Sequence, residues 1–333
     1  MPALDRFNVN KLADLASKRF VLQPDLYVLY RQLDTLAGSG NFNVEQLELI
    51  EAQAELTRNK TLRYYLASLY LQLDETSRAH DLLAGSGRAS REMKRYFSVL
   101  SHSRRHGLPF PKLDKDEESC IDYLDGVISS AQKMFDQYVI GYHGFSIVGN
   151  APGDGSGIPV SDHARFYFND YQKNTRIEDN ASVHVVTPSW RQDTVARSDA
   201  LCISGNNIFH RRSKVWKKFI HQKHFKAIYT LPRSLWSQLC TELDSKPSAG
   251  ILMLTFIAES ISLASENDTS GSRLGSGLKG YIAGFSNDDK SGVNHSYDQE
   301  PASSRHNWSS EAKLFNQNVG LLREYCASLD CER

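Results

Sequence analysis

The sequence predicts an α/β fold in which a mostly parallel sheet is preceded by an all-α N-terminal domain. In roughly the first hundred of the 333 residues, apolar side chains recur at helical spacing. The rest of the chain alternates short β-rich runs with helical ones, and this alternation favours a parallel sheet covered by helices on both faces. We therefore expect a helical domain over residues 1–110 and an α/β domain over 111–333, separated by the Gly-Leu-Pro-Phe-Pro linker at 107–111.

Two amphipathic stretches indicate helices in the N-terminal domain, one from Leu26 to Leu36 and one from Leu62 to Leu73. Each is followed by a glycine-rich stop, LDTLAGSG (Leu33–Gly40) or HDLLAGSG (His80–Gly87), and the shared ending recurs after 47 residues. This period is within the range of helical-repeat units. Glycine at such a stop suits a helix end that needs a left-handed residue. The pattern loosely resembles tetratricopeptide-type arrays.

After the linker, five apolar runs rich in β-branched and aromatic residues predict strands, and three longer stretches predict helices. The strands are expected at Phe145–Val148, Val183–Thr187, Ala200–Ser204, Ala227–Leu231 and Gly280–Phe285, and the helices at Glu117–Phe135, Lys214–His221 and Ala249–Leu263. Ligands of such sheets bind beyond the carboxyl ends of the strands, so the loops that follow them are the candidate site.

Composition excludes several classes of protein. Lysine plus arginine equals aspartate plus glutamate at 39 each, so there is no basic excess of the kind that marks a nucleic-acid binder. A basic cluster (Arg211, Arg212, Lys214, Lys217 and Lys218) fits a solvated helix face or a groove for a phosphorylated ligand. The N-terminus resembles neither a signal peptide nor an anchor. The longest apolar stretch, Gly250 to Ala258, is too short to span a bilayer. Five scattered cysteines suggest neither zinc nor a disulfide scaffold. We expect a cytoplasmic protein.

Three polar or glycine-rich segments are the candidates for chemistry. The loop Gly149–Gly157 fits neither the dinucleotide fingerprint nor a P-loop, and alone it indicates only a flexible turn. Lys246–Ser260 has the pattern of a helix start followed by an apolar run. This pattern fits a capped core helix and an anion-binding helix N-terminus equally well. Asn294–Phe315 contains His295 and His306, and histidine is the natural base at neutral pH. Glu311 also fits a simple favourable interaction with a helix dipole.

Taken together, these segments resemble the sialyltransferase family of animal Golgi enzymes. FSIVGNAPGDGSGIPVSDHARFYFND (Phe145–Asp170) is similar to the family's large motif, and PSAGILML (Pro247–Leu254) with AGF (Ala283–Phe285) to its small motif. HSYD (His295–Asp298) is similar to the third motif, and His306 with Glu311 matches the very short motif, histidine–four residues–glutamate. Four motifs in this order are specific, although each is weak alone. The helical N-terminal part lies outside the resemblance.

The resemblance implies a Rossmann-like GT-A-type glycosyltransferase domain that inverts the anomeric centre and uses no metal ion. The donor would be a sialic-acid-type ulosonic acid on its CMP ester, and the acceptor a glycan hydroxyl. His306 would be the base, His295 would assist the departing phosphate and Glu311 would support the site. Residues expected to bind the CMP group are Asn150, Asn169, Gly149, Ser248, Ala249, Gly250, Gly284 and Tyr297.

Departures from the family leave the donor sugar open. The motif cysteines are missing, Tyr167 stands where arginine is common, and Ala249 replaces threonine. We also expect no stem or membrane anchor of the Golgi type, and this expectation fits a bacterial enzyme of cell-surface glycan synthesis at the inner face of the membrane. Two alternatives remain: the same chemistry with CMP-Kdo, and a helical-repeat module that binds a nucleotide or glycan without turnover. The N-terminal helices are expected to contact a membrane surface or a protein partner, and no cofactor or nucleic acid is expected.

Overall fold

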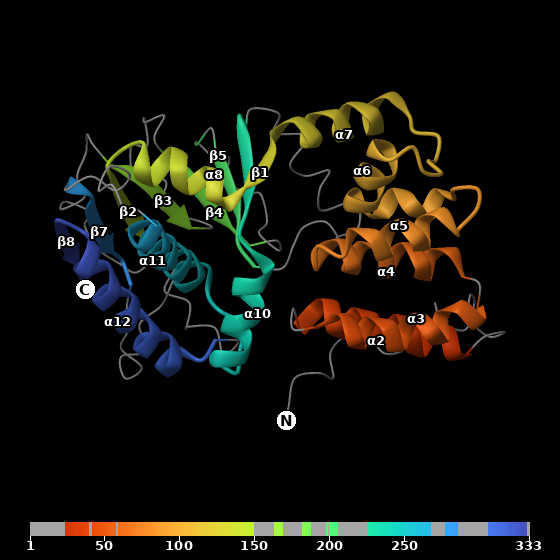
Figure 1. Cartoon of the computed structure of the whole chain (residues 1–333), viewed down its shortest axis with the longest axis horizontal. Coiled ribbons are helices and arrows are strands. Elements are labelled where there is room, and N and C mark those ends of the chain that lie inside the picture. Colours follow the sequence, from red (N-terminus) through yellow and green to blue (C-terminus); the bar gives the residue numbers. More distant parts are fainter. Residues whose placement is uncertain are drawn as a thin grey trace, which may run out of the picture. The chain divides into compact units, whose positions relative to one another are not determined.

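The computed structural model describes residues 24–39, 42–57, 59–149, 163–168, 182–187, 198, 200–205, 225–267, 277–285 and 306–331. The chain divides into two compact units, Met1–Lys112 and Leu113–Arg333, and the division falls two residues after the predicted boundary. The first unit is helical where it is described, and the second is built on one parallel sheet (Figure 1). The expected α/β fold with a parallel sheet is therefore confirmed.

The helical unit packs short amphipathic helices around a core of large side chains. Tyr64, Leu66 and Tyr70 of one central helix are fully buried in it. Asn59 caps that helix by accepting a hydrogen bond from the backbone N–H of Leu62 at 3.0 Å. The elements are α2 (Pro24–Ser39), α3 (Val44–Thr57), α4 (Lys60–Gln72), α5 (Thr76–Ala84), the 3-10 helix η1 (Arg91–Arg95) and α6 (Phe97–Arg105).

The glycine-rich recurrence does not mark equivalent ends of two-helix units. Its first copy closes α2, whereas its second copy closes α5, three helices further along the chain. The second amphipathic stretch and its glycine stop also belong to separate helices, because α4 ends at Gln72 and α5 begins at Thr76. Of the glycines in the second copy, Gly87 has the left-handed φ of 64°. The recurrence therefore reflects similar helix endings rather than a tetratricopeptide-type period.

The second unit contains an eight-stranded sheet in which every pairing is parallel, in the order β1-β6-β5-β4-β3-β2-β7-β8. The five predicted strands are confirmed within two residues at each end. β1, β3 and β8 are additional. β1 and β8 are short strands at the edges of the sheet, and in β3 Arg165 interrupts the apolar run. The bounds are β1 (Ile128–Ser130), β2 (Gly144–Val148), β3 (Ala164–Phe168), β4 (Ser182–Val186), β5 (Ala200–Ile203), β6 (Ala227–Thr230), β7 (Lys279–Ala283) and β8 (Ser328–Cys331).

The prediction of one helix over Glu117–Phe135 is wrong. Helix α7 (Lys115–Val127) begins at a capping box between Asp114 and Glu117 and ends where Ile128 pairs with β6. The chain then forms α8 (Ala131–Met134), which continues into the π-helix η2 (Phe135–Ile140). The periodicity did not reveal the interruption, because three residues of edge strand are too few to break a helical pattern.

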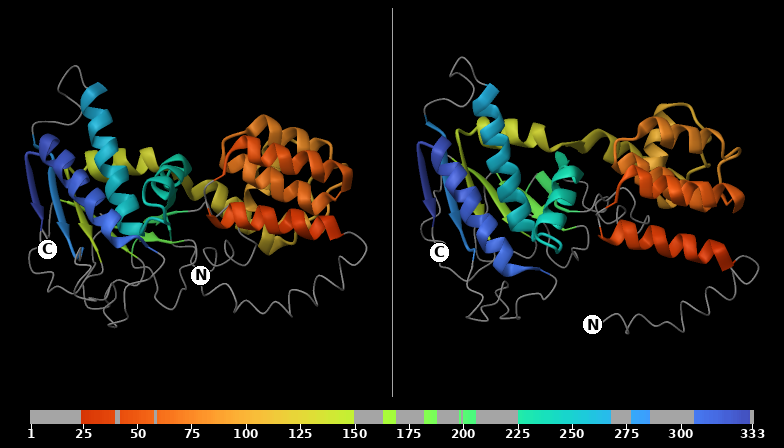
Figure 2. Two further views of the ribbon diagram at one scale, coloured as in Figure 1. Left: turned by 90° about the horizontal axis from the view of Figure 1, so that it is seen from below. Right: turned by 60° about the horizontal axis from the view of Figure 1, so that its bottom comes forward.

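Three longer helices complete the described part of this unit: α10 (Arg233–Glu242), α11 (Ala249–Asn267) and α12 (Trp308–Tyr325). The predicted start of α11 at Ala249 is confirmed, and the helix runs four residues beyond the predicted end. The region expected to be helical at Lys214–His221, with its basic cluster, lies outside the described residues. Figure 2 shows α11 and α12 running side by side next to the strands.

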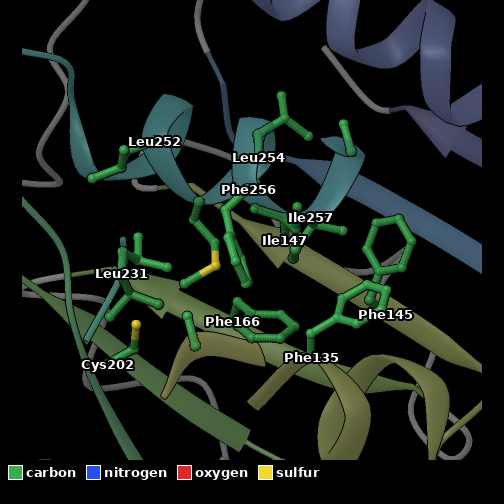
Figure 3. Close-up of a cluster of buried hydrophobic side chains, with 14 of the residues drawn as sticks. Phe135, Phe145, Ile147, Phe166, Cys202, Leu231, Leu252, Leu254, Phe256 and Ile257 are labelled. Carbon is green, nitrogen blue, oxygen red and sulfur yellow. The ribbon is translucent and has the colours of Figure 1, made fainter. Parts of the chain in front are cut away.

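The core of the α/β unit forms where alternate strand residues meet the helices. Phe145 and Ile147 of β2 and Phe166 of β3 contribute to one buried cluster together with Phe135 of η2 and Phe256 of α11 (Figure 3). The intervening strand residues are buried as well, as is typical of parallel strands with both faces covered. Among the described helices, α11 alone is long and apolar enough to cross a membrane. Its apolar residues are accounted for by their place in this core.

Candidate functional site

The candidate site lies where the sheet changes its direction of winding. From β2 the chain adds β3, β4, β5 and β6 on one side, and β7 and β8 then lie on the other side of β2. The region outside the carboxyl ends of β2 and β7 is therefore a topological switch point, the usual ligand position in open α/β sheets. Gly149 directly follows β2 and Gly284 directly follows β7, so the fold brings parts of the large-motif and small-motif segments together.

Gly149 and Gly284 pack backbone against backbone. The N–H of Gly149 donates to the carbonyl of Ala283 at 2.8 Å, and Gly284 has a left-handed φ of 71°. A Cβ at position 149 would lie 2.2 Å from the carbonyl oxygen of Gly284, and a Cβ at position 284 would lie 2.6 Å from that of Gly149. Both glycines are thus required by this close approach, whether or not a ligand is bound.

The Phe285 side chain lies between the end of β7 and the start of α11. Its ring packs near Phe168 and Phe315, with centroid separations of 6.3 and 5.3 Å. A Cβ at Gly250 would lie 2.7 Å from the Phe285 ring. Gly250 therefore leaves room for an aromatic side chain, and the predicted small-motif residues Gly250 and Gly284 are neighbours through Phe285. Sequence reasoning did not identify Phe285, although the Gly-Phe pair lay within the quoted motif.

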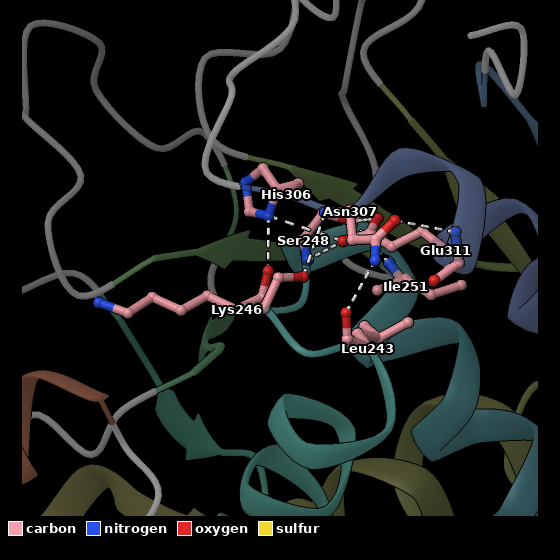
Figure 4. Close-up of polar contacts among 9 residues, drawn as sticks. Leu243, Lys246, Ser248, Ile251, His306, Asn307 and Glu311 are labelled. Carbon is pink, nitrogen blue, oxygen red and sulfur yellow. Dashed lines mark hydrogen bonds and ion pairs between the residues drawn. The ribbon is translucent and has the colours of Figure 1, made fainter. Parts of the chain in front are cut away.

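Glu311 joins the small-motif segment to the very short motif. Its Oε1 accepts a hydrogen bond from the Ser248 N–H at 2.8 Å, and its Oε2 accepts one from the Ser248 hydroxyl at 2.6 Å (Figure 4). Ser248 in turn caps α11, because its Oγ accepts from the N–H of Ile251 at 3.3 Å. The carboxylate is only 5% exposed. Glu311 therefore does more than interact favourably with the dipole of its own helix, because it also binds Ser248 at the start of α11.

Burial raises the pKa of the Glu311 carboxyl above its ordinary value, and the two hydrogen bonds from Ser248 offset part of that increase. The environment therefore favours the neutral acid more than water does. With both oxygens engaged by Ser248, the carboxylate is placed to hold two segments together rather than to bind a ligand itself.

His306 lies at the same junction, just before α12. Its Nδ1 is 2.7 Å from the carbonyl oxygen of Lys246 and 3.6 Å from Oε1 of Glu311 (Figure 4). A carbonyl only accepts hydrogen bonds, so Nδ1 carries the proton, and in the neutral ring Nε2 carries the lone pair. The Trp308 ring lies 5.0 Å away. The side chain is 19% exposed, so the imidazole is held in one orientation while remaining accessible from solvent.

Asn307 is a second residue of this junction that sequence reasoning missed. Its side-chain oxygen caps α12 by accepting from the Ser310 N–H at 3.3 Å, and its Nδ2 donates to the Leu243 carbonyl at 3.1 Å. Its backbone N–H donates to the Ser245 hydroxyl at 3.1 Å. An asparagine three residues before Ser310 is an ordinary N-cap signal. Its contacts with the segment before α11 arise only in the folded chain.

A buried hydrogen bond fixes how α12 lies along α11. Nδ2 of Asn318 donates to Oγ1 of Thr255 at 2.8 Å, and this hydroxyl donates to the Ile251 carbonyl at 2.9 Å. Both side chains are at most 5% exposed. This polar contact lies along the same helix pair as the Glu311–Ser248 contact, so the start of α12 is held against the start of α11 by more than apolar packing.

Seven of the predicted site residues are described, and they lie around the starts of α11 and α12 and the ends of β2 and β7. They are Gly149, Ser248, Ala249, Gly250, Gly284, His306 and Glu311. Asn150, Asn169, His295 and Tyr297 lie outside the described residues. The Ser248 N–H is taken by Glu311, so it is not available to a phosphate. Tyr167, which occupies a common arginine position of the resembled family, is buried in β3.

A cavity of about 310 Å³ lies elsewhere, at the β1–β6 edge of the sheet, and its lining includes Gly126, Lys133 and Lys226. The three strands β5, β4 and β3 lie between this edge and β2, so the cavity is separate from the switch point. None of the motif residues lines this cavity, so it is not part of the candidate site.

Comparison of the chain with protein-family models, with curated proteins and with solved structures found no match in any of the three.

Proposed function

We propose that this chain is an inverting, metal-independent glycosyltransferase of the sialyltransferase type. It would move a sialic-acid-type ulosonic acid from its CMP ester to a hydroxyl of an acceptor glycan. The observation that carries the proposal is the His306–Glu311–Ser248 junction. It joins two motif segments, more than 50 residues apart in the sequence, near the switch point at which α/β sheets bind ligands.

His306 is the general base of the proposed reaction. Donation from Nδ1 to the Lys246 carbonyl sets the tautomer in which Nε2 accepts a proton. Nε2 takes the proton of the acceptor hydroxyl as the new bond forms between that oxygen and C2 of the sugar. The bond between C2 and the phosphate oxygen breaks, and CMP leaves with the electron pair. A single displacement of this kind inverts C2.

The departing phosphate is assigned to the start of α11. Ala249 and Gly250 form its first turn, and no acceptor is recorded for their N–H groups within the described part of the chain. Helix N-termini of this kind stabilise anions through the dipole and the free N–H groups. His295, Asn150, Asn169 and Tyr297 complete the CMP site in the proposal on the strength of the family resemblance alone.

Glu311 is a positioning residue in this scheme. Its bonds to Ser248 fix the start of α11, and its proximity to Nδ1 would stabilise the imidazolium that forms when His306 takes a proton. The proposed architecture is a Rossmann-like GT-A-type domain, for which the parallel sheet is the support. The helical unit is assigned to contacts with the acceptor, a membrane surface or a protein partner in cytoplasmic synthesis of a cell-surface glycan.

The test begins with nucleotides. CMP at 100 times its dissociation constant should stabilise the folded protein by about 2.7 kcal/mol, and UDP and GDP at equal concentration should give much smaller shifts in melting temperature. Equal shifts with UDP would remove the CMP assignment. A panel of CMP-sugars then separates sialic acid from Kdo as donor, and transfer should persist in excess EDTA.

His306→Ala tests the mechanism. It should keep CMP binding and reduce transfer by roughly 10²–10⁴-fold, the usual contribution of a general base. His143→Asn is the matched control, because His143 is exposed, lies outside the junction and has a positive φ of 51° that asparagine tolerates. Full activity of the His306 variant would eliminate the base assignment. CMP binding without transfer of any CMP-sugar would favour the binding-module alternative.

A further inference from the structure

Three histidines gather in the helical unit, which contains none of the motifs of the proposed transferase. His80 lies in α5, His102 lies in the last turn of α6, and His106 directly follows α6. The ring centroids are 6.0 Å apart for His80 and His102, 5.9 Å for His80 and His106, and 4.4 Å for His102 and His106. Each ring therefore neighbours both of the others.

His102 is the buried member of this cluster. It is 8% exposed, and its Nε2 has no hydrogen-bond partner. A buried imidazole nitrogen without a partner loses its hydration without a compensating hydrogen bond, so an additional ligand at this atom would be favourable. His80 is half-buried and His106 is exposed, which leaves the cluster open to solvent on one side.

The spacing of the residues is that of a helical chelate. Positions four apart on a helix lie on the same face, one turn above the other, so His102 and His106 point in similar directions. Paired histidines at this spacing are a recurrent way of binding zinc. His80 supplies a third ring from the neighbouring helix.

We propose that His80, His102 and His106 form a binding site for a divalent transition-metal ion, such as zinc, whose remaining coordination position is taken by water. Imidazole nitrogens bind zinc at about 2.0–2.1 Å. The ring centre lies about 1.2 Å beyond the nitrogen, so three rings in tetrahedral arrangement have centroids about 5 Å apart. The observed separations of 4.4 to 6.0 Å bracket this value.

Ring orientation is the one feature that must change on binding. As the rings stand, no group of three or more histidine, cysteine, aspartate or glutamate side chains among the described residues is arranged to hold a metal ion. The centre of an imidazole ring lies close to the Cβ–Cγ axis, so rotation about χ2 redirects the nitrogens while leaving the centroid in place. This torsion is soft in histidine, so the centroid separations are compatible with metal binding once the rings have turned.

The electrostatics of the cluster keep its ligands in the required form. Burial lowers the pKa of His102, and the neighbouring His106, His80 and Arg105 lower it further. A lowered pKa favours the neutral ring that a metal ligand requires. The three proposed ligands are imidazole nitrogens, a set suited to zinc, nickel and copper.

Metal binding would join α5 to the end of α6 and stabilise the helical unit. Because the ion binds the folded state, a concentration of 100 times the dissociation constant should add about 2.7 kcal/mol. This inference does not depend on the proposed transferase activity, since the three histidines lie in Met1–Lys112 and the motifs in Leu113–Arg333.

The test uses the untagged full chain and Zn²⁺ or Co²⁺, with affinity measured by calorimetry and coordination by the visible absorption of bound Co²⁺. His80→Gln and His106→Gln, at positions that are not fully buried, should each weaken binding by at least the 10- to 100-fold that even an outer-shell change costs. His102→Gln should do the same, but folding of the other two variants is more secure. His143→Asn should bind as the wild type does.

Three results would overturn the site. One is binding of unchanged affinity in His80→Gln and His106→Gln, with both variants folded by circular dichroism. Another is binding that is lost only when His221 and His224, three residues apart further along the chain, are replaced. Absence of any saturable binding to the wild-type chain would refute the proposal as well.

Discussion

Replacing Glu311 by alanine should loosen the junction between the starts of α11 and α12. Each hydrogen bond to a charged acceptor contributes about 1.5–3 kcal/mol, so the two from Ser248 set an upper limit of about 3–6 kcal/mol. The raised pKa of Glu311 shows that burial of the charge cancels part of this amount. We therefore expect Glu311→Ala to lower the free energy of unfolding of the α/β unit by about 2–3 kcal/mol.

Glu311→Gln separates the hydrogen bonds from the charge. Its amide oxygen can still accept from the Ser248 N–H, and its amide nitrogen can donate to the Ser248 hydroxyl. The stability loss should therefore be below about 1.5 kcal/mol, the value of an ordinary hydrogen bond. Glu324→Ala is the matched control, because Glu324 is exposed near the end of the same helix. It should change stability by no more than about 0.5 kcal/mol.

Urea unfolding followed by tryptophan fluorescence suits this comparison. All four tryptophans (Trp190, Trp216, Trp236 and Trp308) belong to Leu113–Arg333, so the signal reports the α/β unit without the helical one. If the proposed activity holds, Glu311→Ala should also reduce transfer by about 10²-fold, because a displacement of about 1 Å at a reacting group costs that much. An alanine variant that unfolds at the same urea concentration as Glu324→Ala would refute the positioning role.

Two further perturbations test the junction and its surroundings. Gly284→Ala should destabilise the α/β unit by more than about 1–2 kcal/mol, because a left-handed alanine is strained and its Cβ would meet the backbone of Gly149. Gly320→Ala, in an open position on α12, should instead be neutral or stabilising by up to about 1 kcal/mol, and equal effects in the same unfolding assay would contradict the packing argument. For pH, the raised pKa of Glu311 means that its protonation favours the folded state, so the stability added by protonation is fully present below about 4.5 and is lost as pH rises through the folded-state pKa. The stability of the wild type relative to Glu311→Gln should therefore decline from pH 4.5 to 7, and a flat or rising difference in urea titrations would show that the carboxyl is not held as described.

The α/β class and five of the strands were predictable because buried parallel strands are short, continuous apolar runs between polar loops. The start of α11 was predictable for a similarly local reason, since proline and small residues before a long apolar run are typical of a helix start. The strands β1 and β8 were not, because they are short edge strands that owe their conformation to pairing with β6 and β7. The interruption of the expected helix at Ile128 has the same cause.

For the candidate site, the sequence by itself determined which residue types were available: a histidine, a glutamate five residues later and a serine before an apolar helix. Only the tertiary structure decided that Glu311 contacts Ser248, that His306 donates to the Lys246 carbonyl and that Gly149 packs on Gly284. The same holds for His80, whose place beside His102 and His106 depends on how α5 packs against α6. Local patterns encode the conformation of neighbouring residues, whereas contacts between distant segments arise from strand order and helix packing, which no single segment specifies.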